Sequence, residues 1–410
     1  MTTPSPTQTA NPVAGGPIYL DYNATTPVDP RVVEALQPYL GEHFGNPSSA
    51  HHYGAAPKAA LARAREQVAV LIGSPAEALI LTGSGSEADS LAIRGTVLHS
   101  LIQDGRRWDH TRPHVVTQVT EHPAVLQACR SLQRLHQVEV TYLPVDGDGI
   151  LSPDVLAAAM TEHTVLVTVM HANNETGVLQ PITELARTAH AFGALFHTDA
   201  AQTVGKIPVD VDDLDVDLLT LVGHKMYAPK GIAALYRRDQ LPLEPLVPGG
   251  GQESGLRAGT ENVALAVALG AAADLAQHDL DTGAPARLAV LRDRLHRELC
   301  RRLPGRVHLN GHPDQRLPHT LNISIDGIGS DALLAQLPEL ATSTGSACHS
   351  ADPEPSPVLH AMGLEPERGL GAIRLSLGRW TTDRDVSRAW DLLTAVSSPG
   401  PARAPTHGTV

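Results

Sequence analysis

Two neighbouring apolar segments that end in ionisable side chains constrain this chain more than any other feature. Residues 194–197 form an apolar run that leads into Thr198 and Asp199, and residues 218–222 form a second run that leads into His224 and Lys225. Such runs alternate with amphipathic segments along most of the chain, which is typical of βαβ units and a parallel sheet. The carboxyl ends of parallel strands lie at one edge of the sheet, where open α/β folds bind ligands. We therefore expect Asp199 and Lys225 at the same edge.

A carboxylate and an amine at one sheet edge match the needs of pyridoxal 5'-phosphate (PLP). Its aldehyde needs an amine for a Schiff base, and its pyridinium nitrogen needs a carboxylate partner. Upstream, residues 79–87 read as a strand, a Gly-Ser loop and a helix start, and the free N–H groups of a helix start favour an anion. Taken alone, this loop fits an ordinary turn better. With Asp199 and Lys225 behind it, phosphate binding is the better interpretation.

The length and the hydrophobic pattern predict two domains between two tails. The chain has 410 residues, which is enough for a large α/β domain with a mostly parallel sheet and a smaller C-terminal α+β domain. The expected division is a disordered tail at 1–16, a PLP-binding domain at 17–265, a small domain at 266–396 and a disordered tail at 397–410. Strands are expected at 114–118, 138–143, 165–170, 194–197, 218–222, 232–236, 320–325, 340–343 and 372–377, and helices at 56–72, 87–101, 181–191 and 288–302.

Composition narrows the setting and the partners. There are 31 Lys and Arg against 44 Asp and Glu, a net charge of −13, which disfavours direct binding of nucleic acid. Three cysteines in a chain of this length do not suggest a disulfide framework. No secretory signal and no apolar run long enough to cross a bilayer are evident, so we expect a cytoplasmic protein without membrane contact. Metal-ligand spacings such as H-E-x-x-H or paired C-x-x-C are absent from the sequence, so no metal site is expected.

Nine short motifs, in order along the chain, resemble those of PLP-dependent cysteine desulfurases. These enzymes belong to the class V aminotransferase group, which also holds the selenocysteine lyases. The resemblance extends from residue 18 to about residue 390 and implies PLP-dependent transferase fold type I. It is carried by residues 19–27, 45–49, 120–122, 171–177, 199–202, 223–225, 257–262, 345–348 and 373–378.

The resemblance also implies roles for individual residues. Lys225 is similar to the lysine that holds PLP, Asp199 to the pyridinium partner, and His122 to the imidazole that stacks on the ring. Arg374 resembles the arginine that binds the substrate carboxylate, a bidentate task that suits a guanidinium group. The other implied contacts are Asn174 and Gln202 with the ring hydroxyl; Gly85, Ser86 and His224 with the phosphate; Asn23 with substrate; and Thr260 with the phosphate bound by a second subunit, which implies a homodimer.

Cys348 resembles the nucleophile that becomes a persulfide and passes sulfur to a protein acceptor. It lies in a polar, glycine-bearing stretch, a poor place for a packing cysteine and a good one for a reactive thiol. Cys129 and Cys300 lie in apolar helical segments and are expected in the core. The predicted reaction converts L-cysteine into L-alanine and a Cys348 persulfide, for iron–sulfur cluster assembly or another sulfur-transfer pathway.

Three alternatives remain at this level. The selenocysteine lyases share the fold and the cofactor, and residues 222–225, 347–350 and 355–359 also resemble them. A plain aminotransferase or β-lyase would not use Cys348. A catalytically silent scaffold would have lost Lys225, Asp199 or Cys348, and all three are present.

Several positions depart from the common desulfurase pattern, among them Val222, Ala228, Ser254, Asp89 and Ser90. Val222 stands where many desulfurases have a serine that binds the phosphate. Asp89, with Ser90, replaces an asparagine pair. We expect Val222 to loosen the cofactor unless a backbone N–H or a water molecule takes over the missing contact.

Overall fold

The computed structural model describes residues 11–103, 112–344 and 355–397. A seven-stranded sheet forms the larger part of the fold, with strand order β2-β8-β7-β6-β5-β3-β4. Strands β7, β6, β5, β3 and β4 pair in parallel, and β8 pairs antiparallel with β7 and β2. The strands are β2 (Leu79–Thr82), β3 (His114–Gln118), β4 (Glu139–Leu143), β5 (Thr164–Thr168), β6 (Leu195–Asp199), β7 (Leu218–Val222) and β8 (Ala233–Arg237).

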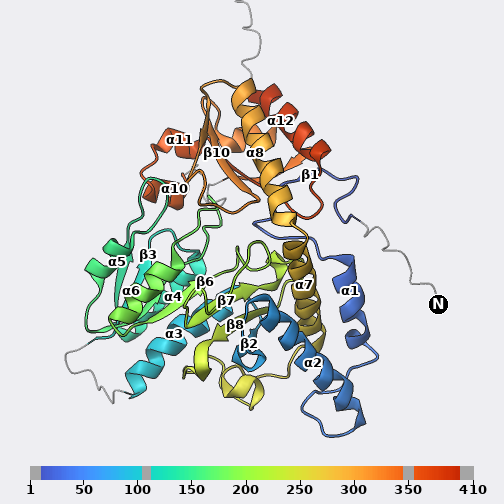
Figure 1. The fold of residues 1–410 in the computed structure, drawn as a ribbon, viewed down its shortest axis with the longest axis vertical. Helices are drawn as coiled ribbons and strands as arrows, with labels where there is room; N and C mark the ends of the chain where they lie inside the picture. The colour runs from blue at the N-terminus through green and yellow to red at the C-terminus, as the bar shows by residue number, and fades with distance from the viewer. Residues whose placement is uncertain (1–10, 104–111, 345–354, 398–410) are drawn as a thin grey trace, which may run out of the picture.

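Helices cover both faces of this sheet, which explains why its strands are apolar without alternation. Neighbouring residues of one strand enter different cores: Val115 packs on the α3 and α4 side, and Val116 packs on the opposite side. Figure 1 shows these helices around the sheet. They are α1 (Pro30–Leu36), α2 (His52–Leu71), α3 (Gly85–Gln103), α4 (Pro123–His136), α5 (Pro153–Ala159), α6 (Ile182–Ala191) and α7 (Val263–Asp281).

The C-terminal elements gather at the other end of the molecule (Figure 1). They build an antiparallel sheet with strand order β12-β13-β10-β9, covered by α8 and α12, with a core of its own. The strands are β9 (Val307–Leu309), β10 (Thr320–Ile325), β12 (Ser343–Thr344) and β13 (Ala372–Ser376). The helices are α8 (Ala284–Arg302), α9 (Ser330–Ala335), α10 (Pro357–Ala361), α11 (Pro366–Leu370) and α12 (Asp383–Ser397).

The N-terminal segment crosses from one part of the molecule to the other. Strand β1 (Ile18–Tyr19) pairs with β11 (Leu340–Ala341) in the smaller part, and Leu20 joins its core. The chain then runs through Asn23 to α1, which packs against α7. The N-terminal segment therefore contributes residues to both the smaller and the larger part of the molecule.

Helix α7 has the length and the apolar composition of a membrane-spanning segment, which the sequence analysis did not identify. Half of the apolar stretch of this helix is buried inside the fold, where the helix packs against α2 and α1. A helix that packs in the core of a folded protein has the same length and apolar composition. The predicted domain boundary near residue 265 lies in the first turn of α7, whereas the two cores meet between α7 and α8.

The predicted fold class is confirmed, and the expected strands and helices form with small shifts at their ends. The segment 340–343 was wrongly predicted to be one strand. Leu340–Ala341 pairs with β1, and Ser343–Thr344 pairs with β13 in a different sheet. The chain changes partner at Thr342, whose hydroxyl donates to the Arg374 carbonyl.

Candidate active site

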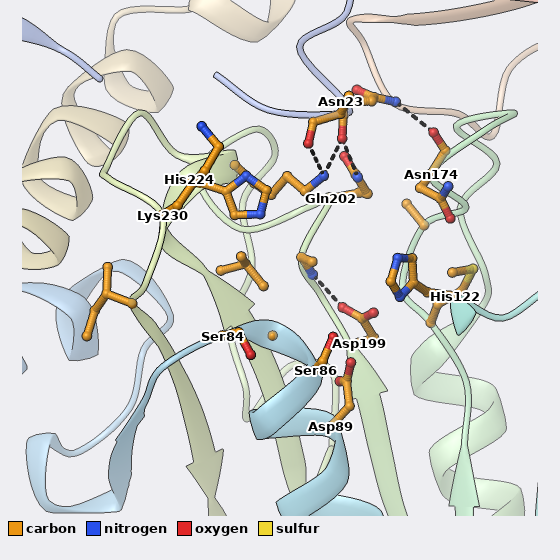
Figure 2. Close-up of a pocket in the computed structure, with 18 of the residues that line it drawn as sticks. Asn23, Ser84, Ser86, Asp89, His122, Asn174, Asp199, Gln202, His224 and Lys230 are labelled. Atoms are coloured by element: carbon orange, nitrogen blue, oxygen red, sulfur yellow. Dashed lines mark hydrogen bonds between the residues drawn. The ribbon is translucent and has the colours of Figure 1, made fainter. Parts of the chain in front are cut away.

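A cavity of about 570 Å³ opens at the carboxyl edge of the large sheet. Strands β2, β6 and β7 end beside it, and the loops that follow β3 and β5 also line it. The predicted residues that line it are Asn23, Gly85, Ser86, His122, Asn174, Asp199, Gln202, His224, Lys225 and Arg374. Figure 2 shows several of these side chains converging from separate elements.

The Lys225 amine lies inside this cavity. A short 3-10 turn, Gly223–Lys225, follows β7 directly and carries the side chain to the sheet edge. Its Nζ donates to the carbonyl oxygen of Ala24 at 2.8 Å and to that of Asn23. Burial, followed by the charge of Arg374, lowers the pKa of Lys225 to about 8. A far larger share of this amine is therefore neutral, and nucleophilic, than in an exposed lysine.

Asp199 ends β6 at the base of the cavity. Its Oδ1 accepts the N–H of Ala201 at 2.9 Å, and only 7% of the residue is exposed. Burial raises the pKa of the Asp199 carboxyl, and His122 and Lys225 oppose that rise. A buried carboxylate needs a cationic or N–H partner, and a protonated pyridine nitrogen supplies both.

His122 caps the start of α4 and faces the same cavity (Figure 2). Its Nδ1 accepts the N–H of Ala124 at 3.2 Å, so the neutral ring carries its proton at Nε2. Burial lowers the pKa of His122. The ring is therefore mostly neutral near pH 7, and it can exchange a proton through Nε2.

The helix start that was predicted to bind phosphate is the N-terminus of α3. Ser84 precedes it, and its Oγ accepts the N–H of Glu87 at 3.2 Å, while Glu87 accepts the N–H of Gly83 at 2.8 Å. This reciprocal capping fixes the loop and leaves the first N–H groups of the helix to an anion. A Cβ on Gly85 would lie 2.6 Å from Val222 Cγ2. A side chain at that position would have to displace Val222.

Arg374 reaches the cavity from β13. Its Nη2 donates to Asp21 Oδ1 at 2.7 Å, and its Nη1 donates to the carbonyl of Asn174 at 2.9 Å. The Nε of this buried guanidinium has no protein acceptor in the described residues. The ion pair with Asp21 therefore holds the guanidinium group in place. The N–H groups that it does not use can donate to a substrate carboxylate.

Asn23 links the two parts of the molecule at this site. Its Oδ1 accepts from His319 Nε2 at 2.9 Å, and its Nδ2 donates to Thr320 Oγ1 at 3.0 Å and to the Asn174 carbonyl at 3.2 Å. Its own carbonyl accepts from Lys225 and Gln202. These contacts hold Asn23 within the protein; its predicted contact with substrate stays a prediction.

Two predicted residues lie elsewhere. Thr260 is exposed and does not line the cavity of its own chain, and its contact with a second subunit stays a prediction. Cys348 lies outside the described residues. Strand β12, the last described element before it, pairs with β13 beside Arg374. Of the other cysteines, Cys129 is buried in α4, where burial raises its pKa to about 12, whereas Cys300 is partly exposed.

Sequence reasoning assigned no role to three residues that shape the site. Asp89 lines the cavity beneath Asp199 (Figure 2), and its Oδ1 is buried without a hydrogen bond. Lys230 lines the cavity beside His224 (Figure 2), and Asp21 holds Arg374. Asp21 lies within the motif at residues 19–27, and Asp89 was noted as a departure from the desulfurase pattern, but no local pattern revealed their contacts. Across the described ranges, no group of three His, Cys, Asp or Glu side chains could hold a metal ion.

Comparison with known proteins decides the family. Residues 18–389 match the family model described as Aminotransferase class-V. The chain belongs to this family. Like other class V aminotransferases, it is PLP-dependent, and its fold is the type I fold of that group.

Several relatives of this class V aminotransferase are named cysteine desulfurases. The chain is 44% identical over 381 residues to the cysteine desulfurase IscS of Dictyoglomus turgidum, covering 92% of this chain and 94% of that one. It is 43% identical over 373 residues to the cysteine desulfurase of Homo sapiens, covering 90% and 79%.

Solved structures of similar proteins agree with this assignment. A NifS-like protein has a TM-score of 0.84 and 32% identity, and the match covers 93% of this chain and 99% of that one. A structure described as SspA in complex with cysteine has a TM-score of 0.76 and 35% identity, and the match covers 88% and 98%.

The residues at the cavity fit PLP. The Lys225 amine can hold its aldehyde, and the Asp199 carboxyl can face its ring nitrogen. The start of α3, where a Cβ on Gly85 would collide with Val222, leaves a narrow cradle for its phosphate. Val222 presents methyl groups there, so this strand end offers no hydroxyl to the phosphate.

Proposed function

We propose that this class V aminotransferase is a cysteine desulfurase, with L-cysteine as substrate and L-alanine as product. One observation carries the proposal: Lys225, Asp199, His122 and Arg374 converge on one cavity in a chain whose relatives are named cysteine desulfurases. Each of these four side chains comes from a different element of the fold. The cavity therefore combines a cofactor site with a site for an amino-acid carboxylate.

Arg374 binds the substrate carboxylate, oriented by Asp21. Lys225 Nζ, with its lowered pKa, takes the α-proton of the substrate. His122 lines the same cavity, and its Nε2 delivers or accepts a proton there. When bound, PLP supplies the electron sink that stabilises negative charge at the α carbon.

Cys348 is the proposed sulfur acceptor. Its thiolate attacks the sulfur of the substrate, an S–S bond forms and the C–S bond of cysteine breaks. The electron pair of that bond stays on the carbon, which gains a proton, so the products are L-alanine and a Cys348 persulfide. The persulfide sulfur then passes to a protein acceptor, either a scaffold for iron–sulfur clusters or another sulfur carrier.

A homodimer completes the proposal. Thr260 is exposed, as a residue that reaches the phosphate site of a second subunit must be. The exposed position of a residue predicted to bind phosphate is what supports this assembly. A cytoplasmic location is proposed on the sequence alone.

An anaerobic assay of the PLP-loaded protein tests the function. We expect L-cysteine and a reductant to give alanine and sulfide in equal amounts. Alanine formation from selenocysteine alone would replace the desulfurase with a selenocysteine lyase. An unchanged rate of alanine formation in Cys348→Ala would show that this thiol is not the sulfur acceptor.

A further inference from the structure

A second lysine, Lys206, lies behind the cofactor cavity without lining it. Gly205, with a φ of 73°, turns the chain after β6, and the N–H of Lys206 donates to the Thr203 carbonyl at 2.9 Å. The side chain extends into the junction between the two parts of the molecule. There it borders a small cavity of about 30 Å³ together with Tyr22 and His319.

Lys206 is hydrogen-bonded to a residue of the predicted cofactor site. Its Nζ donates to Gln202 Oε1 at 3.3 Å, and Gln202 Nε2 donates to the Asn23 carbonyl at 3.1 Å. The same Asn23 carbonyl accepts from the Lys225 amine. Lys206, Gln202, Asn23 and Lys225 therefore form one chain of hydrogen bonds that ends at the proposed PLP-binding amine.

The Gln202 amide can take two orientations, and only one of them suits the site. With Oε1 toward Lys206, one N–H of Nε2 reaches the Asn23 carbonyl and the other is left for the cofactor cavity, which Gln202 lines. In the flipped orientation, Oε1 would face another acceptor, the Asn23 carbonyl. The Lys206 donor and the Asn23 acceptor therefore favour the same orientation, in which an N–H group of Gln202 faces the cavity.

We propose that Lys206 is a positioning residue, which fixes the Gln202 amide so that its N–H group, and not its oxygen, faces the cofactor. This inference rests on the proposed PLP site and extends it to a residue outside the cavity. Lys206 acts through Gln202 and does not touch the cofactor itself.

The electrostatic surroundings of Lys206 favour a neutral amine that donates a hydrogen bond over a charged amine in an ion pair. Burial, followed by the charges of Lys225 and Arg374, holds the pKa of Lys206 well below its usual range. A charged amine only donates, and a neutral amine keeps N–H groups to donate. In the neutral state the Asn23 carbonyl also keeps Gln202 Oε1 toward Lys206.

A double-mutant cycle on the apoprotein tests the inference. The variants are Lys206→Met, Gln202→Met and the double variant, because methionine fills similar space without a strong donor. The first readout is the dissociation constant of PLP from an absorbance titration. The second is the absorbance maximum of bound PLP, which a merely structural role would leave unchanged. Lys58→Met, at an exposed position of α2, is the matched control, and the melting temperature of each apoprotein reports folding.

We expect Lys206→Met to weaken PLP binding about tenfold in the wild-type background. In the Gln202→Met background, we expect its effect to fall below about twofold, because coupled residues are not additive. The absorbance maximum should shift in the same direction in both single variants. Equal losses in both backgrounds, or no loss in either, would overturn the positioning role. A wild-type protein that does not bind PLP would overturn the proposed function, and this inference with it.

Discussion

At the scale of single residues, burial sets the ionisation of the site. The Lys225 amine has an ordinary pKa of 10.5, which burial and Arg374 lower to about 8. Roughly a tenth of an amine with that pKa is neutral at pH 7, and the neutral form is the one that attacks an aldehyde.

The rate at which Lys225 captures PLP should follow this pKa. We expect borohydride-trapped attachment of PLP to the apoprotein to speed up with rising pH and to level off above a pH of about 8. The sign follows because a higher pH removes the proton that blocks the amine. A rate that continued to rise toward the ordinary lysine pKa would contradict the effect of burial on Lys225. Lys225→Ala supplies the control for attachment at other amines.

Asp89 and Asp199 are adjacent buried carboxyls with different expected roles. Burial, followed by the charge of Asp199, raises the pKa of Asp89 well above 3.8. Asp89 therefore keeps a proton under conditions where Asp199 must be ionised to face a pyridinium ring. We expect Asp89→Asn to bind PLP as the wild type does, and Asp199→Asn to bind it at least about tenfold more weakly. Similar losses in the two variants, measured by PLP titration, would contradict this division.

The same carboxyl predicts a pH dependence of stability. Because the folded state holds the Asp89 proton more tightly than the unfolded state, its stabilising contribution is present below pH 3.8 and is lost as the pH rises through the folded pKa. The stability of Asp89→Asn apoprotein relative to wild type should therefore increase as the pH rises across that range. Urea unfolding at several pH values measures it, and a constant difference would count against a raised pKa of Asp89.

At the scale of elements, the end of β7 and the start of α3 form the phosphate cradle. Val222 lines it with methyl groups and approaches Gly85. We expect Val222→Ser to bind PLP up to about tenfold more tightly, because a hydroxyl there adds a hydrogen bond to a charged group. Val222→Ala removes the same apolar contact without adding a hydroxyl, so it is the matched control. Serine and alanine variants with equal affinity would show that a hydroxyl at position 222 does not contribute to phosphate binding.

The elements also show what the sequence could predict and what it could not. Lys225 and Asp199 were predicted because each follows an apolar strand directly, so local pattern and sheet topology determine their positions. The Arg374–Asp21 ion pair joins residues 353 positions apart, and no local pattern encodes such a contact. The change of sheet partner at Thr342 depends on β1, a strand of two residues, which is too short to be recognised from hydrophobic alternation.

At the scale of the whole molecule, Arg379 joins the smaller part to the larger one. Its guanidinium donates to Asp29 at 2.6 Å and to Asp279 at 2.9 Å, and it lies 4.1 Å from the centroid of the Tyr227 ring. Asp29 caps α1, and Asp279 belongs to α7. Both carboxylates lose this partner if Arg379 is removed, although Asp29 keeps Arg31.

We expect Arg379→Met to lower the free energy of unfolding by about 3 kcal/mol, since breaking a buried ion pair leaves uncompensated charge. Arg388→Met, which removes an exposed pair with Glu339, should change it by less than about 1 kcal/mol. Urea unfolding of both apoproteins measures the difference. Equal small effects would show that the junction does not depend on Arg379.

Mass spectrometry of the enzyme after a single turnover with L-cysteine tests the central claim most directly. The account predicts that the peptide containing Cys348 gains the mass of one sulfur atom while one equivalent of L-alanine forms. It also predicts that Lys225→Ala gives neither product. Alanine formed without added sulfur on Cys348, or sulfur found on Cys129 or Cys300 instead, would contradict it.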